Sequence, residues 1–460
     1  MTKRRAQLWL GVILCAGMAF RAAVVSTWHV PAGDGIQYYQ LSQELIAHHR
    51  FAIEPPPADV SIARMPGYPL FLAAIVMQAP LELGRHLIRA TAANVIIDAL
   101  TALLVLAIVL RFGEGWRVGL VGVVITLSCP LLLLLCCYGL SEALATMLST
   151  LAVWLALRGM EERLLRNALL AGLVAGVCLL CRGDTATLAA PMGLAFWFAD
   201  APLRKRLAAI ALTGAVVLVV FSPWLIRNMI QFGAPHPEAT YWRDRQGKPL
   251  PTTMVEWERT WASSAPGESY FDMAGANGIQ LDPTRPGILM PQMYDSDEEK
   301  AEVAALFRRY SHERWTPAVV DGFRELARAR RARHPFKTYL ILPITRMYHL
   351  WAPMPEYELP MRVWWLGLPR LRYTFGWIHG VLYLLALVGM GVLWRRGGRA
   401  RQRMWVLSSW LAARMLMLGY AVPVGVTQRY LVEAFPVLIV CAAVALGALE
   451  ARLRSSPPAG

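Results

Sequence analysis

Residues 207–226 read LAAIALTGAVVLVVFSPWLI, a stretch without a charge that follows Arg204-Lys205-Arg206 and precedes Arg227. A helix of about 20 apolar residues crosses the roughly 30 Å hydrocarbon core of a bilayer. Comparable runs recur along both ends of the chain, which has 460 residues, 56% of them hydrophobic and 17% charged. This composition is too apolar for a soluble domain of that length. The sequence therefore predicts an all-α, polytopic membrane protein.

About ten apolar runs are candidate transmembrane helices, and the basic residues between them set their orientation. The runs cover residues 8–28, 87–110, 117–135, 141–157, 168–182, 185–199, 207–226, 375–394, 404–423 and 431–449. The basic linkers after every second run then fall on the same side as Lys3-Arg4-Arg5. This side is predicted to be cytoplasmic and to hold both termini. The first run has no convincing cleavage site, so it is predicted to remain as a helix.

The chain divides into four predicted parts. They are a transmembrane core (1–227, including the first outer loop, 29–86), an extracytoplasmic domain with interfacial helices (228–374), C-terminal spans (375–450) and a disordered cytoplasmic tail (451–460). In the outer loop, an amphipathic helix is expected at about 35–48, and the apolar piece 69–80 is too short to cross. A charged helical stretch is expected at 297–333, and an interfacial helix at 335–351.

Charge and cysteine usage exclude other classes of protein. The formal net charge of +15 lies in short clusters between apolar runs, which sets topology and argues against a nucleic-acid partner. The seven cysteines lie within or at the ends of apolar segments, so neither a disulfide framework nor a zinc site is indicated. His48-His49 lacks companions at metal-site spacing. No metal site is predicted.

Ionisable side chains at the predicted outer mouth of the bundle are the first candidates for function. Asp34 follows the first span, and its alternative role is a helix N-cap. Arg64 precedes the short helix, where it would meet a lipid phosphate, either at a site or as ordinary headgroup contact. Glu142 begins a descending span, where a carboxylate also complements the helix dipole.

Two further arginines are predicted at the same surface. Arg227 ends one span beside Trp224, and Arg429 opens the last span beside Tyr430. The planar guanidinium suits phosphate oxygens, although the aromatic neighbours alone would also fit an interfacial belt.

Charged and polar groups elsewhere in the predicted spans have more local interpretations. Arg182 and Asp184 share the outer end of one span and are expected to form an internal ion pair. Asp98, one turn after Asn94, is a further buried polar candidate on the second span.

Five short motifs, taken in order, resemble the C-type membrane glycosyltransferase superfamily. They are Asp34-x3-Tyr38, RMPGYPLFLA at 64–73, Ser141-Glu142 after a proline-bearing span, PWLIRN at 223–228, and Arg429-Tyr430 followed by Pro436. The resemblance covers nearly all of residues 8–450. It is closest to the bacterial branch similar to the dolichyl-phosphate-mannose–protein mannosyltransferases and the lipid A aminoarabinose transferases. Singly each motif is weak, and the ordered set is more specific.

The resemblance implies roles for several residues. In that superfamily an acidic residue of the first outer loop is essential, and here it matches Asp34 as the catalytic residue. The donor phosphate would bind Arg227, Arg429 and Arg64, while the acceptor or sugar would contact Glu142, Tyr38, Tyr68 and Tyr430. The weakly matching region 228–374 would select the acceptor. No cofactor is required by this scheme, although some members use a divalent cation.

The predicted function is transfer of a sugar from a polyprenyl-phosphate-linked donor to an acceptor lipid, protein or glycan, with inversion. The enzyme would lie in the inner (plasma) membrane of a bacterium, with its active site facing the periplasm or the cell exterior. The main alternative is a transporter or flippase of a lipid-linked saccharide, which would use the same arginines without transfer chemistry. Transporters often show two related halves, and this chain shows no such duplication. A catalytically inactive scaffold is a third possibility.

Overall fold

The computed structural model describes residues 2–28, 33–52, 64–79, 81–232, 253–263, 289–313, 316–351, 369–422 and 428–455, and no strand occurs in these ranges. The elements are α1 (Lys3–Trp28), α2 (Gly33–His48), α3 (Gly67–Phe71), η1 (Leu72–Met77), α4 (Leu83–Arg111), α5 (Trp116–Ser128), α6 (Pro130–Cys136), α7 (Glu142–Gly159), α8 (Leu164–Cys181), η2 (Gly183–Leu188), α9 (Ala189–Trp197), α10 (Leu203–Phe232), α11 (Thr253–Glu258), η3 (Pro291–Met293), α13 (Asp297–Glu313), α14 (Pro317–Arg333), η4 (Lys337–Ile341), α15 (Leu342–Trp351), α17 (Pro369–Arg396), α18 (Gly398–Ala421), η5 (Gln428–Ala434) and α19 (Phe435–Ser455).

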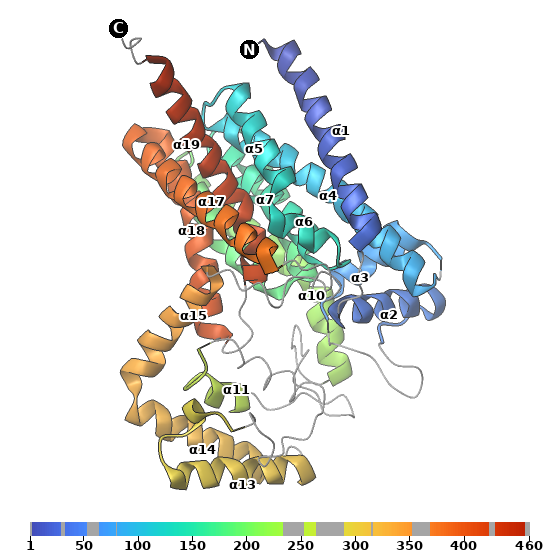
Figure 1. The fold of residues 1–460 in the computed structure, drawn as a ribbon, viewed down its shortest axis with the longest axis vertical. Helices are drawn as coiled ribbons and strands as arrows, with labels where there is room; N and C mark the ends of the chain where they lie inside the picture. The colour runs from blue at the N-terminus through green and yellow to red at the C-terminus, as the bar shows by residue number, and fades with distance from the viewer. Residues whose placement is uncertain are drawn as a thin grey trace.

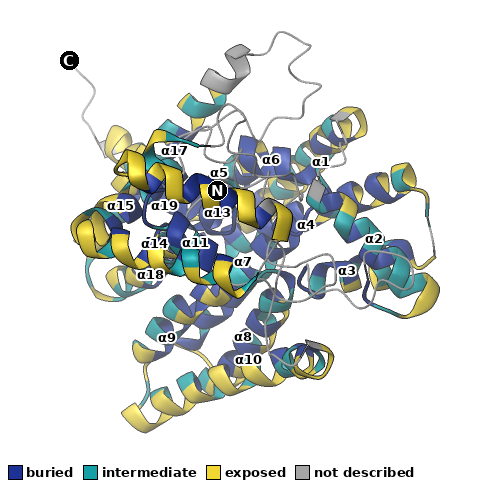
Figure 2. Cartoon of the chain, turned by 90° about the horizontal axis from the view of Figure 1, so that it is seen from below, coloured by how far each residue is buried: buried dark blue, intermediate teal, exposed yellow. Residues whose placement is uncertain are grey.

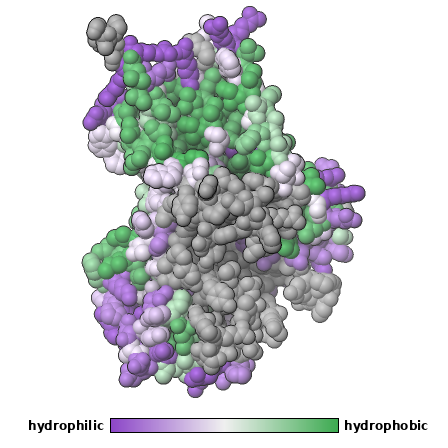
Figure 3. All heavy atoms as spheres, viewed as in Figure 1, coloured by the Kyte–Doolittle hydropathy of each residue, from purple (hydrophilic) through white to green (hydrophobic). Residues whose placement is uncertain are grey.

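Six helices in the described ranges are long and apolar enough to cross a membrane, or seven if the bent pair α5 and α6 is one span. In Figure 3 their side chains form a broad hydrophobic band. The predicted all-α polytopic membrane protein is therefore confirmed. The predicted runs in α7, α9 and α18 are also helical, but they do not pass the same test. Helix α9 has only nine residues, and α18 carries several arginines.

The two ends of the bundle carry different parts of the chain. Helix α1 begins and α19 finishes at one end, while α11, α13 and α14 lie at the other (Figure 1). The basic linkers meet at the first of these ends: Arg111 bonds Glu161 at 3.1 Å, and Arg117 bonds Glu450 at 3.4 Å. The charge pattern thus assigned these linkers to a common side correctly. We call the opposite end the site end.

Burial separates central helices from those at the periphery. The apolar window of the last span is 83% buried, whereas that of α10 is 22% buried. Figure 2 shows the exposed stripe along α10. Helix α10 therefore presents one side to the surroundings, and α19 lies at the centre of the bundle.

The predicted run 117–135 is broken into α5 and α6, which are bent by 50° at Cys129 and Pro130. Arg21 of α1 lies at the bend, where it donates hydrogen bonds to the carbonyl oxygens of Thr126 (2.9 Å) and Leu127 (3.0 Å). Its charge is compensated by an ion pair with Asp98 of α4. Arg21 thus satisfies carbonyl groups that the end of α5 leaves without helical partners.

The first outer loop contains the two expected helices. Helix α2 matches the amphipathic segment, and α3 continues into η1 as a short apolar helix that is not a candidate span. Gly67 opens α3 against the end of α8, where a Cβ would lie 2.7 Å from the carbonyl carbon of Leu180. Only glycine permits this approach, which brings the preceding turn, with Arg64, to the bundle.

The domain at the site end has its own apolar core, which includes Trp257, Phe307 and Phe323. The charged stretch predicted as one helical segment, 297–333, is two helices, α13 and α14, with Thr316 as the N-cap of the second. Helix α15 joins this domain to the bundle through the buried Arg346. Its guanidinium donates to the carbonyl oxygens of Arg259, Ala262 and Gly419 at 2.7–3.1 Å.

Two helices extend beyond their predicted ends. Helix α10 continues through residue 228 to Phe232, because apolar side chains extend beyond the predicted end of the span. Helix α19 continues to Ser455, so residues 451–455 are helical rather than disordered. Residues 456–460 lie outside the described ranges, as do 53–63, 233–252, 264–288 and 352–368 of the predicted outer regions.

Candidate active site

Four arginines and four carboxylates form one ion-pair cluster at the site end, and their formal charges cancel. They come from α2, the turn before α3, α7, the junction of α8 with η2, α18 and η5. The members of this charge cluster are Asp34, Arg64, Glu142, Arg182, Asp184, Arg414, Arg429 and Glu433.

Asp34 lies in the first turn of α2, at the rim of the charge cluster, and its side chain is 25% exposed. One carboxylate oxygen pairs with Arg64, and the other accepts a hydrogen bond from Arg429 at 2.9 Å. The carboxylate therefore binds arginines, and the alternative role as N-cap is not what the structure shows. Burial raises the pKa of Asp34, but Arg64 and Arg429 outweigh it and hold the pKa below 3.8. Asp34 is ionised at neutral pH.

Glu142 lies deeper, at the start of α7, and is fully buried. Its Oε1 pairs with Arg429 and, at 2.9 Å, with Arg182. Arg182 continues the chain of ion pairs to Asp184 at 3.1 Å and to Glu433 at 2.7 Å. The expected pair of Arg182 and Asp184 is confirmed, but it belongs to the site rather than standing apart from it.

Sequence reasoning missed Arg414 and Glu433. Arg414 of α18 pairs with Asp184 at 2.8 Å and with Glu433 of η5, and both Arg414 and Glu433 are fully buried. Both residues stand inside apolar runs that were predicted to span the membrane. An ionisable residue in such a run is itself a signal of function, and it could have identified them.

The tyrosines predicted to contact a ligand differ in position. Tyr430 lies beside Arg182, whose guanidinium carbon is 5.9 Å from the ring centroid. Tyr38 is buried between Arg64 and Ser141, and its hydroxyl bonds Ser141 at 3.1 Å. Burial raises the pKa of Tyr38 to about 12, so its hydroxyl stays protonated. Tyr68 packs behind Tyr38 with no exposed surface and supports that ring, and its predicted ligand contact stays a prediction.

Arg227 does not share the carboxylates of Arg64 and Arg429. Its guanidinium lies over the rings of Trp224 (4.5 Å) and Phe51 (5.5 Å) and donates to Asn228 at 2.7 Å. Trp224 and Phe51 belong to a small apolar cluster with Met65, the neighbour of Arg64. The structure therefore places Arg227 next to the charge cluster, in an aromatic setting.

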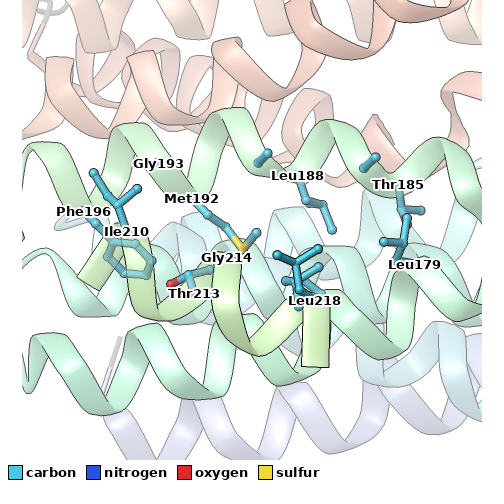
Figure 4. Close-up of a pocket in the computed structure, with 14 residues that line it drawn as sticks. Leu179, Thr185, Leu188, Met192, Gly193, Phe196, Ile210, Thr213, Gly214 and Leu218 are labelled. Atoms are coloured by element: carbon cyan, nitrogen blue, oxygen red, sulfur yellow. The ribbon is translucent and has the colours of Figure 1, made fainter. Parts of the chain in front are cut away.

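A groove of about 330 Å³ runs between α8, η2, α9 and α10, lined almost entirely by apolar side chains. Thr185 and Leu179 lie at one end of it, and Phe196 and Ile210 at the other (Figure 4). Thr185 follows Asp184 directly, so the groove starts beside the charge cluster. Leu218 in its wall is 65% exposed, so the groove can be reached from the side of the bundle.

The cluster contains arginine donors for an anion, and its four carboxylates are all paired with arginines. In the described ranges no three His, Cys, Asp or Glu side chains are grouped to hold a metal ion. Each of the four carboxylates is instead paired with at least one arginine, and a divalent cation would meet those arginine charges. Arginines in such an arrangement are suited to phosphate oxygens.

The family comparison and the fold support a resemblance to one class of protein, the C-type membrane glycosyltransferases. Residues 68–226, about a third of the chain, match the family model described as dolichyl-phosphate-mannose-protein mannosyltransferase. This match and the fold confirm the predicted resemblance to that superfamily. Among curated proteins, no sequence matches this chain.

Solved structures of an archaeal oligosaccharyltransferase share the fold. The oligosaccharyltransferase of Archaeoglobus fulgidus in complex with Zn and sulfate is 15% identical over 96% of this chain, with a TM-score of 0.51. The same archaeal enzyme, AglB, with an inhibitory peptide and a dolichol-phosphate, is 14% identical over 99% of this chain, with a TM-score of 0.52. This chain covers 49% and 52% of their lengths. ArnT from Cupriavidus metallidurans bound to undecaprenyl phosphate is 15% identical over 90% of this chain and 77% of its own, with a TM-score of 0.43.

Proposed function

We propose that this chain is a membrane glycosyltransferase that takes its sugar from a polyprenyl-phosphate-linked donor. One observation carries the proposal: the arginine-rich charge cluster stands at the end of an apolar groove that opens to the side of the bundle. A polyprenyl phosphate has the same two parts, a charged head and a long apolar tail. The groove would take the tail from the membrane while the head meets the arginines.

The reaction needs a nucleophile, a leaving group and charge stabilisation. A hydroxyl or amine of the acceptor attacks the anomeric carbon, and its bond to that carbon forms as the bond between the carbon and the phosphate oxygen breaks. The bonding electrons leave on the phosphate. Arg64 and Arg429 stabilise that charge, as preorganised donors do in other enzymes. Asp34 takes the proton of the acceptor. A single displacement of this kind inverts the anomeric centre.

The other members of the cluster act through these three residues. Glu142 is fully buried, so it is proposed to hold Arg429 and Arg182 in position rather than to touch the sugar. Arg227 lies on α10 beyond the residues that line the groove, and it is proposed as an additional phosphate contact. Tyr430 remains the proposed sugar contact. No step in this scheme uses a divalent cation.

The acceptor would be a lipid, a protein or a glycan, and the domain formed by α11, α13 and α14 is proposed to select it. We place the enzyme in the inner (plasma) membrane of a bacterium, with both termini cytoplasmic and the site end facing the periplasm or the cell exterior. Both termini lie at the same end of the bundle, away from the site end, which supports this orientation (Figure 1).

The test is transfer in vitro. Purified protein receives a panel of polyprenyl-phosphate sugars with a broad acceptor extract, and release of free polyprenyl phosphate is measured. We expect release by the native protein, its loss in Asp34→Asn, and a smaller decrease in Arg227→Ala. The matched control is Glu44→Gln on the same helix, whose carboxylate pairs with Arg50 outside the charge cluster.

The transporter gives the opposite result. It would release no polyprenyl phosphate with any donor, while labelled lipid-linked sugar would still cross vesicle membranes. That pair of results would overturn the transferase. Repeating the assay with a chelator tests whether transfer needs a divalent cation. We expect full activity in the presence of the chelator.

A further inference from the structure

In this structure Asp34 is paired with Arg64 and Arg429, the two arginines that are proposed to stabilise the donor phosphate. Arg64 pairs with one carboxylate oxygen and Arg429 donates to the other. The formal charges of the eight cluster residues cancel, so an incoming phosphate finds no excess positive charge within the cluster itself. It can bind these arginines strongly only if one of them changes its partner.

Asp34 is the carboxylate that can give up its arginines most easily. A carboxylate released from an ion pair must be hydrated, because an unpaired buried charge is strongly unfavourable. The Asp34 side chain is 25% exposed, whereas those of Glu142 and Glu433 have no exposed surface. Water can therefore replace the arginines at Asp34 but cannot reach the other two.

One of the two arginines that bind Asp34 is also the most exposed arginine of the cluster. The side chain of Arg429 is 27% exposed, compared with 10% for Arg64, 11% for Arg182 and 0% for Arg414. Asp184 is partly exposed as well, but its partners are the less accessible Arg182 and Arg414. An anion that approaches from the rim reaches Arg429 first.

Resting on the proposed function, we infer that the donor phosphate competes with Asp34 for Arg64 and Arg429, and that its binding releases Asp34 to act on the acceptor. Before the donor binds, Asp34 is a counter-ion held on both oxygens. Afterwards its oxygens are available to accept the proton of the acceptor. The exchange imposes an order in which the donor binds first, so the base is activated only when there is a sugar to transfer.

The test measures binding, so it needs no acceptor. Farnesyl phosphate is titrated into the detergent-solubilised full-length chain and followed by isothermal titration calorimetry. Asp34→Asn removes the competing charge with little change of shape, and we expect it to bind farnesyl phosphate roughly fivefold to tenfold more tightly than the native chain does. Asp34→Ala, an independent variant with different packing, should change the affinity in the same direction. Glu44→Gln removes a carboxylate from the same helix outside the cluster and should not change it.

Each other result has a definite meaning. If the native chain binds farnesyl phosphate and both Asp34 variants bind it equally or less tightly, the competition is overturned while the proposed function stands. An equal gain in Glu44→Gln would also overturn it, because the effect would then be general electrostatic attraction. If no variant binds farnesyl phosphate, including the native chain, the proposed function itself fails.

Discussion

Among the described residues of the bundle, the Arg21–Asp98 pair and the charge cluster are both buried, and they differ in composition and in contact with solvent. Arg21 and Asp98 form a closed pair with 0% and 1% exposure, and further N–H groups of Arg21 bind the carbonyls at the bend of α5. The charge cluster joins eight side chains, and its rim residues Asp34 and Arg429 are about a quarter exposed.

This difference separates a structural ion pair from a candidate active site. In the closed pair, Arg21 stabilises the bend between α5 and α6, and Asp98 neutralises the charge of Arg21. In the charge cluster, arginines share carboxylates from several elements and reach a rim open to ligands. An arginine of the charge cluster can exchange one carboxylate for another anion, whereas Arg21 has no other anion to replace Asp98 among the described residues. The predictions below test that distinction.

The largest effect is expected on stability, from Asp98→Asn. The substitution leaves Arg21 as an unpaired buried charge, which costs roughly 3–5 kcal/mol in the free energy of unfolding. Thermal unfolding in detergent measures the loss. A double variant, Arg21→Met with Asp98→Leu, should recover much of it. Normal stability together with lost transfer activity would instead place Asp98 in the catalytic machinery.

The second effect falls on activity. Arg429→Lys keeps the charge but loses the planar fork that joins Asp34 to Glu142, so we expect transfer to fall roughly 100-fold, or about 2.7 kcal/mol. The rate of polyprenyl phosphate release gives the result. Arg50→Lys is the matched control, because Arg50 pairs with Glu44 away from the cluster. Equal losses in both variants would contradict a special role for Arg429.

The third effect concerns the groove. Gly214 lines it, and a Cβ at this position meets no atom within 4 Å. Gly214→Leu should therefore fill the groove without disturbing its walls and raise the KM for a long-chain donor about tenfold, or about 1.4 kcal/mol. A donor with a very short chain should be unaffected. Gly11→Leu on α1, also in open space, is the control. Equal effects on both donors would show that the groove does not bind the lipid tail.

The fourth effect is a dependence on pH. Despite its burial, the pKa of Asp34 is lowered by Arg64 and Arg429, so its ion pairs stabilise the fold at neutral pH and weaken only as pH falls through that low pKa. We expect kcat/KM for the donor, which reports the free enzyme, to decrease only at a pH below the usual titration range of an aspartate. The kcat, which reports the donor complex, should begin to decrease at a higher pH than kcat/KM does, because Asp34 has lost its arginines in that complex. Coincident profiles would contradict the exchange of partners at Asp34.

The smallest effect is expected at the other end of the bundle. Glu450 pairs with Arg117 at 3.4 Å, and both side chains are more than 40% exposed. Glu450→Gln should change the free energy of unfolding by less than about 0.5 kcal/mol, because exposed pairs are hydrated in both states. A loss comparable with that of Asp98→Asn would mean that exposure does not decide the strength of these pairs.

The sequence predicted part of the site and missed part of it. Asp34, Arg64, Glu142 and Arg429 were identified from motifs, and the structure brings them together. Arg414 and Glu433 were missed because the apolar runs around them pointed to span formation. Their proximity to Asp184 depends on the packing of α18 and η5, which no local pattern encodes. Tyr68 was assigned to the ligand by the same motif, yet packing buries it.

The membrane class, the helical runs and the common side of the basic linkers could all be predicted from the order of the residues. The physical reason is that the thickness of a bilayer and the cost of burying charge act locally along the chain. Three features could not be predicted in this way: the carboxylate that each arginine binds, the bend at the end of α5 that Arg21 holds, and the groove that begins beside Asp184. These features depend on side chains that are far apart in sequence and meet only when the helices pack.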